Sequence, residues 1–439
     1  MRKTLVVTAL FALLTAGLAG CGGNGETNNT TQNNGKVNTS NSANTATPGE
    51  GTNEEVSGTI TYLTNRTDLI GNVYDEYAKR FNEKYPNAHV EFEAVTDYDK
   101  TAKVRLSSGD YPDVMNIPTI SNSELSNFYA PLDDIGLNDR IRFKDYKSFD
   151  GKTYGIPSSV DAVGIVYSKK TFESAGITEV PKTLDEFYAA CEKLKAKGVV
   201  PFASNFKDQW PLYPFAQETP VAISGDANFY NARVQSDTPY TMDGPFGQSM
   251  SIVRTMYEKG YLEPDVNSTN WEQSKLDIAS GKFGMYYLGE WIIDQLITGA
   301  GMASDDVGFF PFPYDNDPTT NNVLLQPGAS SYGINKDSKN MAAAKAFVKW
   351  MIEESGDDKN VFPILKDKEP ELVQIREFES YNPQYIEGVA DSIEAVGITN
   401  KAQITKEAIV QEFILSKNPQ DVFTKYNEKW AKAKKEVVK

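Results

Sequence analysis

Residues 59–117 decide the fold, and they read TITYLTNRTDLIGNVYDEYAKRFNEKYPNAHVEFEAVTDYDKTAKVRLSSGDYPDVMNI. Three short segments of this stretch have the alternating or apolar pattern of β-strands. Two segments between them have helical periodicity, as Val73, Tyr77 and Phe81 illustrate. Strands that alternate with helices in this way predict an α/β fold, in which a parallel sheet carries helices on its faces. The expected strands cover residues 59–63, 89–95 and 113–117.

A second set of strands and helices follows the turn at Asp150-Gly151. Residues 162–168, AVGIVYS, form a continuous apolar strand, and Thr183 opens a helix through a capping box with Glu186. Cys191 lies on the apolar face of that helix, so we expect it to be buried. The roughly 380 residues that follow the N-terminal region are too many for one ordinary domain and fit two.

The N-terminus has the order of a secretory signal. Basic residues precede the apolar, uncharged residues 5–19, and Leu18-Ala19-Gly20-Cys21 closes the run. This LAGC sequence resembles the bacterial lipoprotein box, which implies diacylglyceryl transfer to Cys21 and cleavage before it. The alternatives are an ordinary signal peptide with a chance cysteine, or an uncleaved anchor. We therefore predict a signal peptide over residues 1–20, and a disordered polar tether over residues 21–56.

Composition and charge exclude several classes of function. The formal net charge of −16 argues against nucleic acid as a partner, because nucleic-acid phosphates must be neutralised by lysine and arginine. The chain has two cysteines, and since Cys21 is assigned to lipidation, Cys191 has no disulfide partner. The single histidine, His89, lies in an alternating strand where we expect it to be exposed, and no cysteine cluster accompanies it. We therefore expect no metal site and no cofactor.

A set of short segments carries a family resemblance, and each is weak by itself. The segments are FNEKYP (81–86), LSSGDYPDV (106–114), GKTYGIP (151–157), VYSKK (166–170), PKTLDEF (181–187), KGVVP (197–201), SGKFGMYYLGEW (280–291), FPFP (310–313) and GASSYGINKDSK (328–339). Taken together and in this order, they resemble the extracellular solute-binding proteins of carbohydrate importers, the family-1 type allied to maltose-binding protein. The resemblance covers the chain from about Thr59 to Glu354.

The resemblance implies a two-lobed α/β fold of the type II periplasmic-binding-protein kind. Each lobe then has a mainly parallel sheet with flanking helices, and the ligand lies in the cleft between the lobes. A mono- or oligosaccharide ligand, hinge closure around it, and delivery to the permease subunits of an ABC importer are further implications. We expect a monomer at the extracellular face of the bacterial cell membrane, anchored by the lipid on Cys21. The expected N-lobe comprises residues 57–164 and 325–370, and the expected C-lobe residues 165–324 and 371–439.

A sugar presents hydroxyl groups and a patch of C–H surface, so its site needs aromatic faces and directed polar groups. Trp291 follows Gly289-Glu290 at a strand-to-helix turn and is the main candidate for stacking; burial beneath the helix is the alternative. Trp210 lies in a proline-flanked loop and Trp271 opens a helix, and packing is the alternative for both. The candidate polar contacts are Asn65, Arg66, Asp68, Asn116, Asp161, Glu290, Gly328, Ser330 and Ser331.

Position along the chain is the reason for these polar candidates. Asn65, Arg66 and Asp68 lie in the loop after the first strand, where a solvated turn is the alternative. Asp161 lies at the expected crossing between the lobes, where its carboxylate is placed to accept two hydroxyl hydrogen bonds. Glu290 lies at a helix N-terminus, which attracts acidic residues in any case through the helix dipole.

Two other classes of function stay open. A cell-surface glycosidase uses two carboxylates, and although Asp161 and Glu290 are available, a chain this rich in acidic residues always offers such a pair. Nothing in the chain resembles a Gly-x-Ser-x-Gly motif or a phosphate-binding loop, so we expect no enzyme. The other class is a binding protein for a different solute. An anion needs a cluster of arginine or lysine, for which Arg66 alone is thin support, whereas a cation needs aromatic rings with carboxylates, which this chain has.

Overall fold

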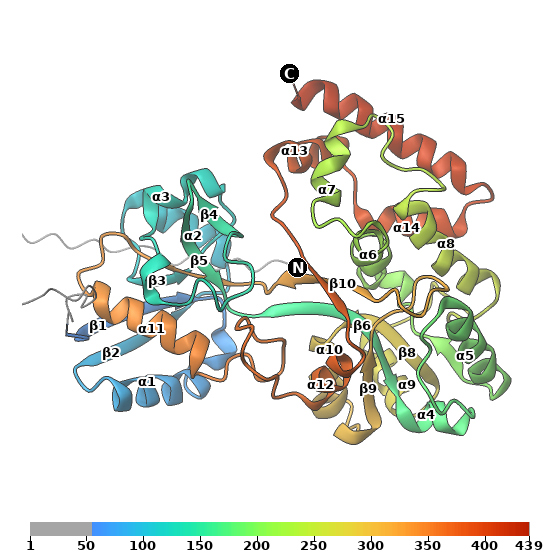
Figure 1. Cartoon of the computed structure of the whole chain (residues 1–439), viewed down its shortest axis with the longest axis horizontal. Coiled ribbons are helices and arrows are strands. Elements are labelled where there is room, and N and C mark those ends of the chain that lie inside the picture. The colour runs from blue at the N-terminus through green and yellow to red at the C-terminus, as the bar shows by residue number, and fades with distance from the viewer. Residues whose placement is uncertain (1–54, 439) are drawn as a thin grey trace, which may run out of the picture. The chain divides into compact units, whose positions relative to one another are not determined.

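The computed structural model describes residues 55–438 (Figure 1). The predicted signal peptide, Cys21 and most of the predicted tether lie outside these residues. No helix among residues 55–438 is both long and apolar enough to cross a membrane. The α/β class is confirmed, since the described chain contains two six-stranded sheets with helices packed on them.

The first sheet contains the three strands predicted between residues 59 and 117. In spatial order it consists of β2 (Ala88–Ala94), β1 (Gly58–Thr64), β3 (Val114–Asn116), β11 (Ser331–Ile334), β5 (Lys152–Pro157) and β4 (Lys147–Phe149). Helices α1 (Val73–Lys84) and α11 (Met341–Glu353) pack on one face, where the ring centroids of Phe347 in α11 and Tyr62 in β1 are 5.7 Å apart. Helix α2 (Tyr98–Ser108) packs on the other face, in a small cluster with Leu63 and Met115.

The second sheet is built around the long apolar strand predicted at 162–168. Its main path is β12 (Gln384–Glu387), β10 (Asn322–Pro327), β6 (Val160–Ser168), β8 (Phe283–Gly289) and β7 (Val200–Phe202), and β9 (Val307–Phe310) also pairs with β6. Helix α3 (Leu125–Phe128) lies against β4 of the first sheet. The remaining helices are α4 (Lys169–Ser174), α5 (Leu184–Ala196), α6 (Glu218–Ser224), α7 (Phe229–Ala232), α8 (Pro245–Glu258), α9 (Trp271–Ala279), α10 (Trp291–Asp294), α12 (Val373–Ser380), α13 (Ile393–Ala402), α14 (Lys406–Leu415) and α15 (Pro419–Val437).

Both sheets are mixed, and the expectation of mainly parallel sheets was wrong in this respect. Strands β1, β2 and β3 are parallel, but β11 runs antiparallel to both β3 and β5. In the second sheet, β6 is antiparallel to β8, β9 and β10. For β4 and β5 the physical reason is the length of the connection, because the turn at Asp150-Gly151 is too short for a crossover and the two strands pair antiparallel. The directions of β11 and β10 depend on where longer connections return.

Local predictions hold with one exception. Cys191 is fully buried in α5, His89 is exposed in β2, and the capping box of Thr183 and Glu186 is present. The exception is Val73, which is exposed, while its neighbour Tyr74 is buried together with Tyr77 and Phe81. The ring of Tyr74 stacks on Phe92 of β2 with centroids 4.4 Å apart, so an aromatic contact with the sheet determines which face of α1 is buried.

Two chain crossings connect the sheets and are hydrogen-bonded to each other. The Ser158 N–H donates to the Ser330 carbonyl at 2.9 Å, and the Gly328 N–H donates to the Ser159 carbonyl at 2.8 Å. A Cβ atom on Gly328 would lie 2.1 Å from Ser159 Oγ, so glycine is required for this close approach. The chain passes from one sheet to the other at residues 158–159 and again at residues 328–330. The expected lobe boundaries, at 164/165 and 324/325, lie a few residues away. The limits of the lobes stay a proposal.

The C-terminal helix α15 is held by Trp430. Its side chain is fully buried, and its indole Nε1–H donates to the Ser236 carbonyl at 3.0 Å. The guanidinium of Arg233 lies over the indole ring, 4.9 Å from its centroid. The end of the chain is therefore packed firmly against the segment around residue 233.

Candidate functional site

Three tryptophans that the sequence analysis considered one at a time form a cluster. Trp210 begins the short 3₁₀ helix η5 (Trp210–Phe215), Trp271 begins α9 and Trp291 begins α10. Ring centroids are 4.8 Å apart for Trp210 and Trp271, 5.8 Å for Trp210 and Trp291, and 6.2 Å for Trp271 and Trp291. The rings are inclined to one another by 44–70°, so they do not stack face to face. Trp210 is 37% exposed and the other two are half-buried, which leaves aromatic surface available to a ligand.

Local structure fixes the positions of these rings. Trp271 is the first residue of α9, whose N-cap Asn270 accepts a hydrogen bond from the Gln273 N–H at 3.0 Å. Trp291 lies at the end of β8 behind Gly289, where a Cβ atom would lie only 2.4 Å from the Trp291 Nε1 atom. The indole of Trp291 therefore folds back over the end of the strand because Gly289 has no side chain.

A pair of carboxyl groups, Asp161 and Glu290, lies beside the cluster. Glu290 is fully buried, and its Oε2 accepts a hydrogen bond from the Ala162 N–H at 3.0 Å. Asp161 is half-buried at the start of β6, within hydrogen-bonding reach of Glu290. Burial raises the pKa of both groups, and the neighbouring Asp161 charge raises the pKa of Glu290 further. The pair therefore tends to retain a proton.

Polar side chains continue from Asp161 onto strand β10, and we call Asp161, Gln326, Glu218 and Tyr213 together the polar floor. Gln326 is the register partner of Asp161, and its Nε2 donates to Glu218 Oε1 at 2.8 Å. Glu218 is buried at the start of α6, and this burial raises its pKa to about 8, although Lys406 opposes the shift. Tyr213 of η5 lies among these groups: burial raises its pKa well above the ordinary value, and the charges of Glu218, Glu290 and Asp161 add to the rise.

The predicted residues of the first sheet lie at the carboxyl ends of its parallel strands, where α/β proteins commonly bind ligands. The Tyr62 hydroxyl donates to Asn116 Oδ1 at 2.7 Å, and Asn116 Nδ2 donates to Asn65 Oδ1 at 3.3 Å. Asn116 is buried, so it holds Asn65 in place. Arg66 and Asp68 are exposed and form a two-bond ion pair, with Nε–Oδ1 and Nη2–Oδ2 distances of 2.9 and 2.8 Å.

The three candidates on the return crossing are engaged through their backbones. The Gly328 N–H and the Ser330 carbonyl form the bonds between the crossings described above. The Ser331 carbonyl accepts from the Ile117 N–H at 2.8 Å, and the residue is buried. The backbone groups of Gly328 and Ser330 thus serve the connection between the sheets, whereas that of Ser331 serves the first sheet. Contact of these three residues with a ligand stays a prediction.

Two adjoining cavities extend the polar floor. The smaller, about 190 Å³, is lined by Gln326, Lys406 and Tyr146, among others. The larger, about 1100 Å³, begins at Tyr146 and Asp391, which line both cavities. Hydroxyl and amide side chains lie in its wall next to apolar ones. Its lining residues include Ser107, Ser121, Asn122, Ser123, Phe128, Phe149, Ile393 and Val396.

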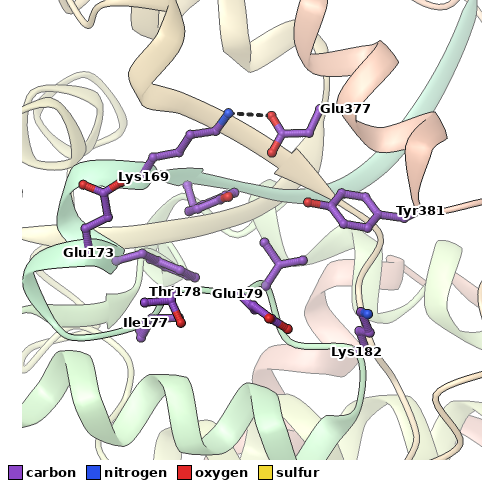
Figure 2. A pocket seen from close by; sticks show the side chains of 11 residues that line it. Lys169, Glu173, Ile177, Thr178, Glu179, Lys182, Glu377 and Tyr381 are labelled. Atoms are coloured by element: carbon purple, nitrogen blue, oxygen red, sulfur yellow. Dashed lines mark ion pairs between the residues drawn. The ribbon is translucent and has the colours of Figure 1, made fainter.

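A separate pocket of about 420 Å³ lies at the other end of β6, near Tyr167 (Figure 2). Figure 2 shows Lys169 joined to Glu377 across this pocket, with an Nζ–Oε2 distance of 2.8 Å, and Tyr381 at its side. Lys169, the first residue of α4, comes eight residues after Asp161, which is about 26 Å along the strand at roughly 3.3 Å per residue. This pocket is therefore not part of the site that contains the tryptophans.

Sequence reasoning missed the polar residues around Asp161. Tyr213 was signalled by its position three residues after Trp210 in the same proline-flanked segment. Gln326 and Glu218 carried no signal, because their role depends on the pairing of β10 with β6 and on the burial of the start of α6. Among residues 55–438, no group of three or more histidine, cysteine or acidic side chains is arranged to hold a metal ion.

Comparisons with known proteins give one family. A family model described as bacterial extracellular solute-binding protein matches residues 67–358. The multiple sugar-binding protein of Streptococcus mutans is 26% identical over 302 residues, which are 67% of this chain and 70% of that protein. The chain matches between 56% and 70% of the length of this protein and two other curated relatives.

Solved structures extend the likeness over most of the chain. A binding protein of an ABC transporter from Bifidobacterium animalis subsp. lactis, in complex with mannobiose, is 30% identical with a TM-score of 0.68, and the match covers 87% of this chain and 95% of that one. The apo form of RafE from Streptococcus pneumoniae has a TM-score of 0.72 at 19% identity, covering 87% and 99%, and supports the fold alone.

Proposed function

Because this chain belongs to the bacterial extracellular solute-binding proteins, we propose that it captures a carbohydrate outside the cell and delivers it to an ABC importer. One observation carries the proposal: Trp210, Trp271 and Trp291 form a cluster, and Tyr213, which interacts with Trp291, also feels the charges of Asp161 and Glu290. Aromatic surface next to hydrogen-bond acceptors is what a sugar ring requires, since it has C–H faces and hydroxyl edges.

An oligosaccharide fits the site better than a single sugar ring. The polar floor continues from Asp161 through Gln326 into the two adjoining cavities, of about 190 and 1100 Å³. Their combined size exceeds that of an ordinary small-molecule pocket. The relative at 30% identity was solved with mannobiose, and a second Bifidobacterium protein at the same identity was solved with mannotriose.

Binding without catalysis is supported by the state of the carboxyl pair. A glycosidase needs two carboxyl groups that both reach the scissile bond. Glu290 is fully buried and bonded to the Ala162 N–H, so it does not reach a bound sugar. A binding protein for another solute is the second candidate, because aromatic rings beside carboxylates also suit an organic cation.

Hinge closure is supported by the crossings between the sheets. The two crossings are bonded to each other through Ser158–Ser330 and Gly328–Ser159, so we expect them to bend together. Closure of this kind places the ligand between groups of both sheets, such as Asn65 on one side and Trp291 on the other. The closed form is the one that we expect the permease to recognise, and we expect a monomer to dock.

The test of the carbohydrate proposal is a thermal-shift screen of the purified protein. A ligand that binds only the folded state stabilises it by about 2.7 kcal/mol at 100 times its dissociation constant. We expect a rise in Tm with mannobiose, mannotriose, raffinose or stachyose, and none with phosphate or amino acids. A rise with spermidine alone would favour the organic-cation alternative, and no rise with any sugar would reject the proposal.

We also propose that Cys21 carries the lipid that anchors the protein to the outer face of the cell membrane. The support is the LAGC sequence behind an apolar run, together with membership of an extracellular family. In cells that produce the full chain, Cys21→Ser is expected to move the protein from the membrane fraction to the soluble fraction or the medium, detected by immunoblot. Cys191→Ser is the matched control and stays with the membrane; membrane retention of Cys21→Ser would contradict the proposal.

A further inference from the structure

Glu290 has a buried oxygen atom without a hydrogen-bond partner. Its Oε2 accepts from the Ala162 N–H at 3.0 Å, whereas its Oε1 is buried and has no partner among the described residues. A buried polar atom of this kind destabilises the fold when it stays unsatisfied. Asp161, which is itself an acid, lies within hydrogen-bonding reach of Glu290. Two acids make a hydrogen bond only when one of them carries the proton.

We propose that Glu290 is a positioning residue whose protonated Oε1 donates to the Asp161 carboxylate and fixes Asp161 as an acceptor for ligand hydroxyl groups. The inference rests on the proposed function, since it assigns Asp161 to the ligand and Glu290 to Asp161. It separates two carboxyl groups that sequence alone treats as equivalent: Asp161 is half-buried and reachable, and Glu290 is fully buried.

The surroundings of the pair favour a single shared proton. Tyr213 faces both carboxyl groups from η5, and its own raised pKa keeps it neutral. Gln326 lies opposite Asp161 on β10 and is neutral, and Trp291 on α10 contributes no charge. Among residues 55–438, burial, the partner carboxyl group and backbone hydrogen bonds have the largest effects on the pKa of Asp161 and Glu290, and no lysine or arginine is among these causes. Two like charges side by side without a cation do not both form at neutral pH.

A second acid, Glu218, lies beyond Gln326 and must be separated from the pair. Burial raises its pKa to about 8, and Lys406 of α14 faces it, with its own pKa lowered by burial. Gln326 Nε2 donates to Glu218 Oε1, so ionisation of Glu218 keeps this bond, whereas ionisation of the pair breaks the bond between Glu290 and Asp161. The two titrations therefore have different consequences for the ligand.

The proposal predicts that affinity falls as the pH rises. The pKa of both pair members is raised, so the shared proton is present at low pH and is lost on going toward alkaline pH, when Asp161 and Glu290 repel each other. The ligand for calorimetry is whichever of mannobiose, mannotriose, raffinose or stachyose gives the largest thermal shift. We expect its Kd to be about tenfold higher near pH 9 than near pH 6, because one hydrogen bond to a charged group is lost.

Variants separate positioning from other roles. Glu290→Gln keeps a donor that has no proton to lose, so it is expected to bind as the native chain does near pH 6 and to lose the pH dependence. Glu290→Ala is expected to bind about tenfold more weakly at every pH. Glu218→Gln tests the neighbouring acid and is expected to keep the fall in affinity toward alkaline pH. Glu379→Gln is the matched control, because Glu379 of α12 has a pKa raised by burial and lines neither cavity. Circular dichroism checks that each variant is folded.

Three outcomes overturn the inference while the proposed function stands. They are sugar binding by the native chain without pH dependence, a Glu290→Gln profile that matches the native one, and a Glu218→Gln variant that abolishes the pH dependence. If none of the four sugars binds the native chain, the proposed function fails and the inference fails with it.

Discussion

Trp291→Ala is expected to weaken sugar binding by on the order of 1–3 kcal/mol, the range measured for stacking on aromatic side chains in nucleic-acid complexes. Since about 1.4 kcal/mol corresponds to tenfold in Kd, the loss is about 5-fold to 150-fold. The reason is that the Trp291 and Trp210 ring centroids are 5.8 Å apart and that Trp291 interacts with Tyr213, which also feels the charge of Asp161. Removal of the ring therefore takes away aromatic surface close to polar groups. Isothermal titration calorimetry of the folded variant measures the effect.

The matched control for this truncation is Tyr257→Ala. Tyr257 is an exposed aromatic residue of α8 that belongs to neither the cluster nor the cavities around it. We expect its removal to leave the Kd unchanged. An unaltered Kd for folded Trp291→Ala, or an equal loss for both variants, would contradict the assignment of Trp291 to the ligand.

Trp430→Ala is expected to lower the free energy of unfolding by about 3–5 kcal/mol, as is usual for truncation of a large buried aromatic residue. The substitution leaves a cavity in the core and removes the hydrogen-bond donor to the Ser236 carbonyl. It also removes the cation–π contact of the buried Arg233 with the indole ring. Urea denaturation followed by circular dichroism measures the change.

The matched control is again Tyr257→Ala, which is expected to change stability by less than about 0.5 kcal/mol, as surface substitutions usually do. Trp430 lies on α15, outside the tryptophan cluster, so the folded fraction of Trp430→Ala is expected to bind sugar normally. A loss of stability below about 1 kcal/mol would show that α15 is not held in the way the structure indicates.

The sequence predicted the elements well because local patterns encode them. Alternation marked β1 and β2, and the capping box at Thr183 marked the start of α5. Strand direction was not encoded locally: whether β11 or β10 runs with or against its neighbours depends on where a long connection returns. The exposure of Val73 was missed for a similar reason, since the stacking of Tyr74 on Phe92 is a tertiary contact.

The site was predicted in parts, and its assembly was not. Each tryptophan was recognised from its position at a helix start or in a proline-flanked segment. Nothing in the sequence indicates that Trp271 and Trp291, which follow Trp210 by 61 and 81 residues, place their ring centroids 4.8 and 5.8 Å from that of Trp210. The difference between Asp161 and Glu290 was also out of reach, because it is a difference of burial. A sequence gives the chemistry of a carboxyl group, and the fold determines its protonation.

The tryptophan cluster also has a consequence for the intrinsic fluorescence of this protein. The chain has five tryptophans, and the two outside the cluster, Trp350 and Trp430, are 2% and 0% exposed. We expect their emission to form a constant background, and the emission of Trp210, Trp271 and Trp291 to change if a sugar displaces water from these indole rings as proposed. Capture and release can therefore be followed in real time by intrinsic fluorescence, without a dye attached to a protein whose one buried thiol, Cys191, is unsuited to labelling.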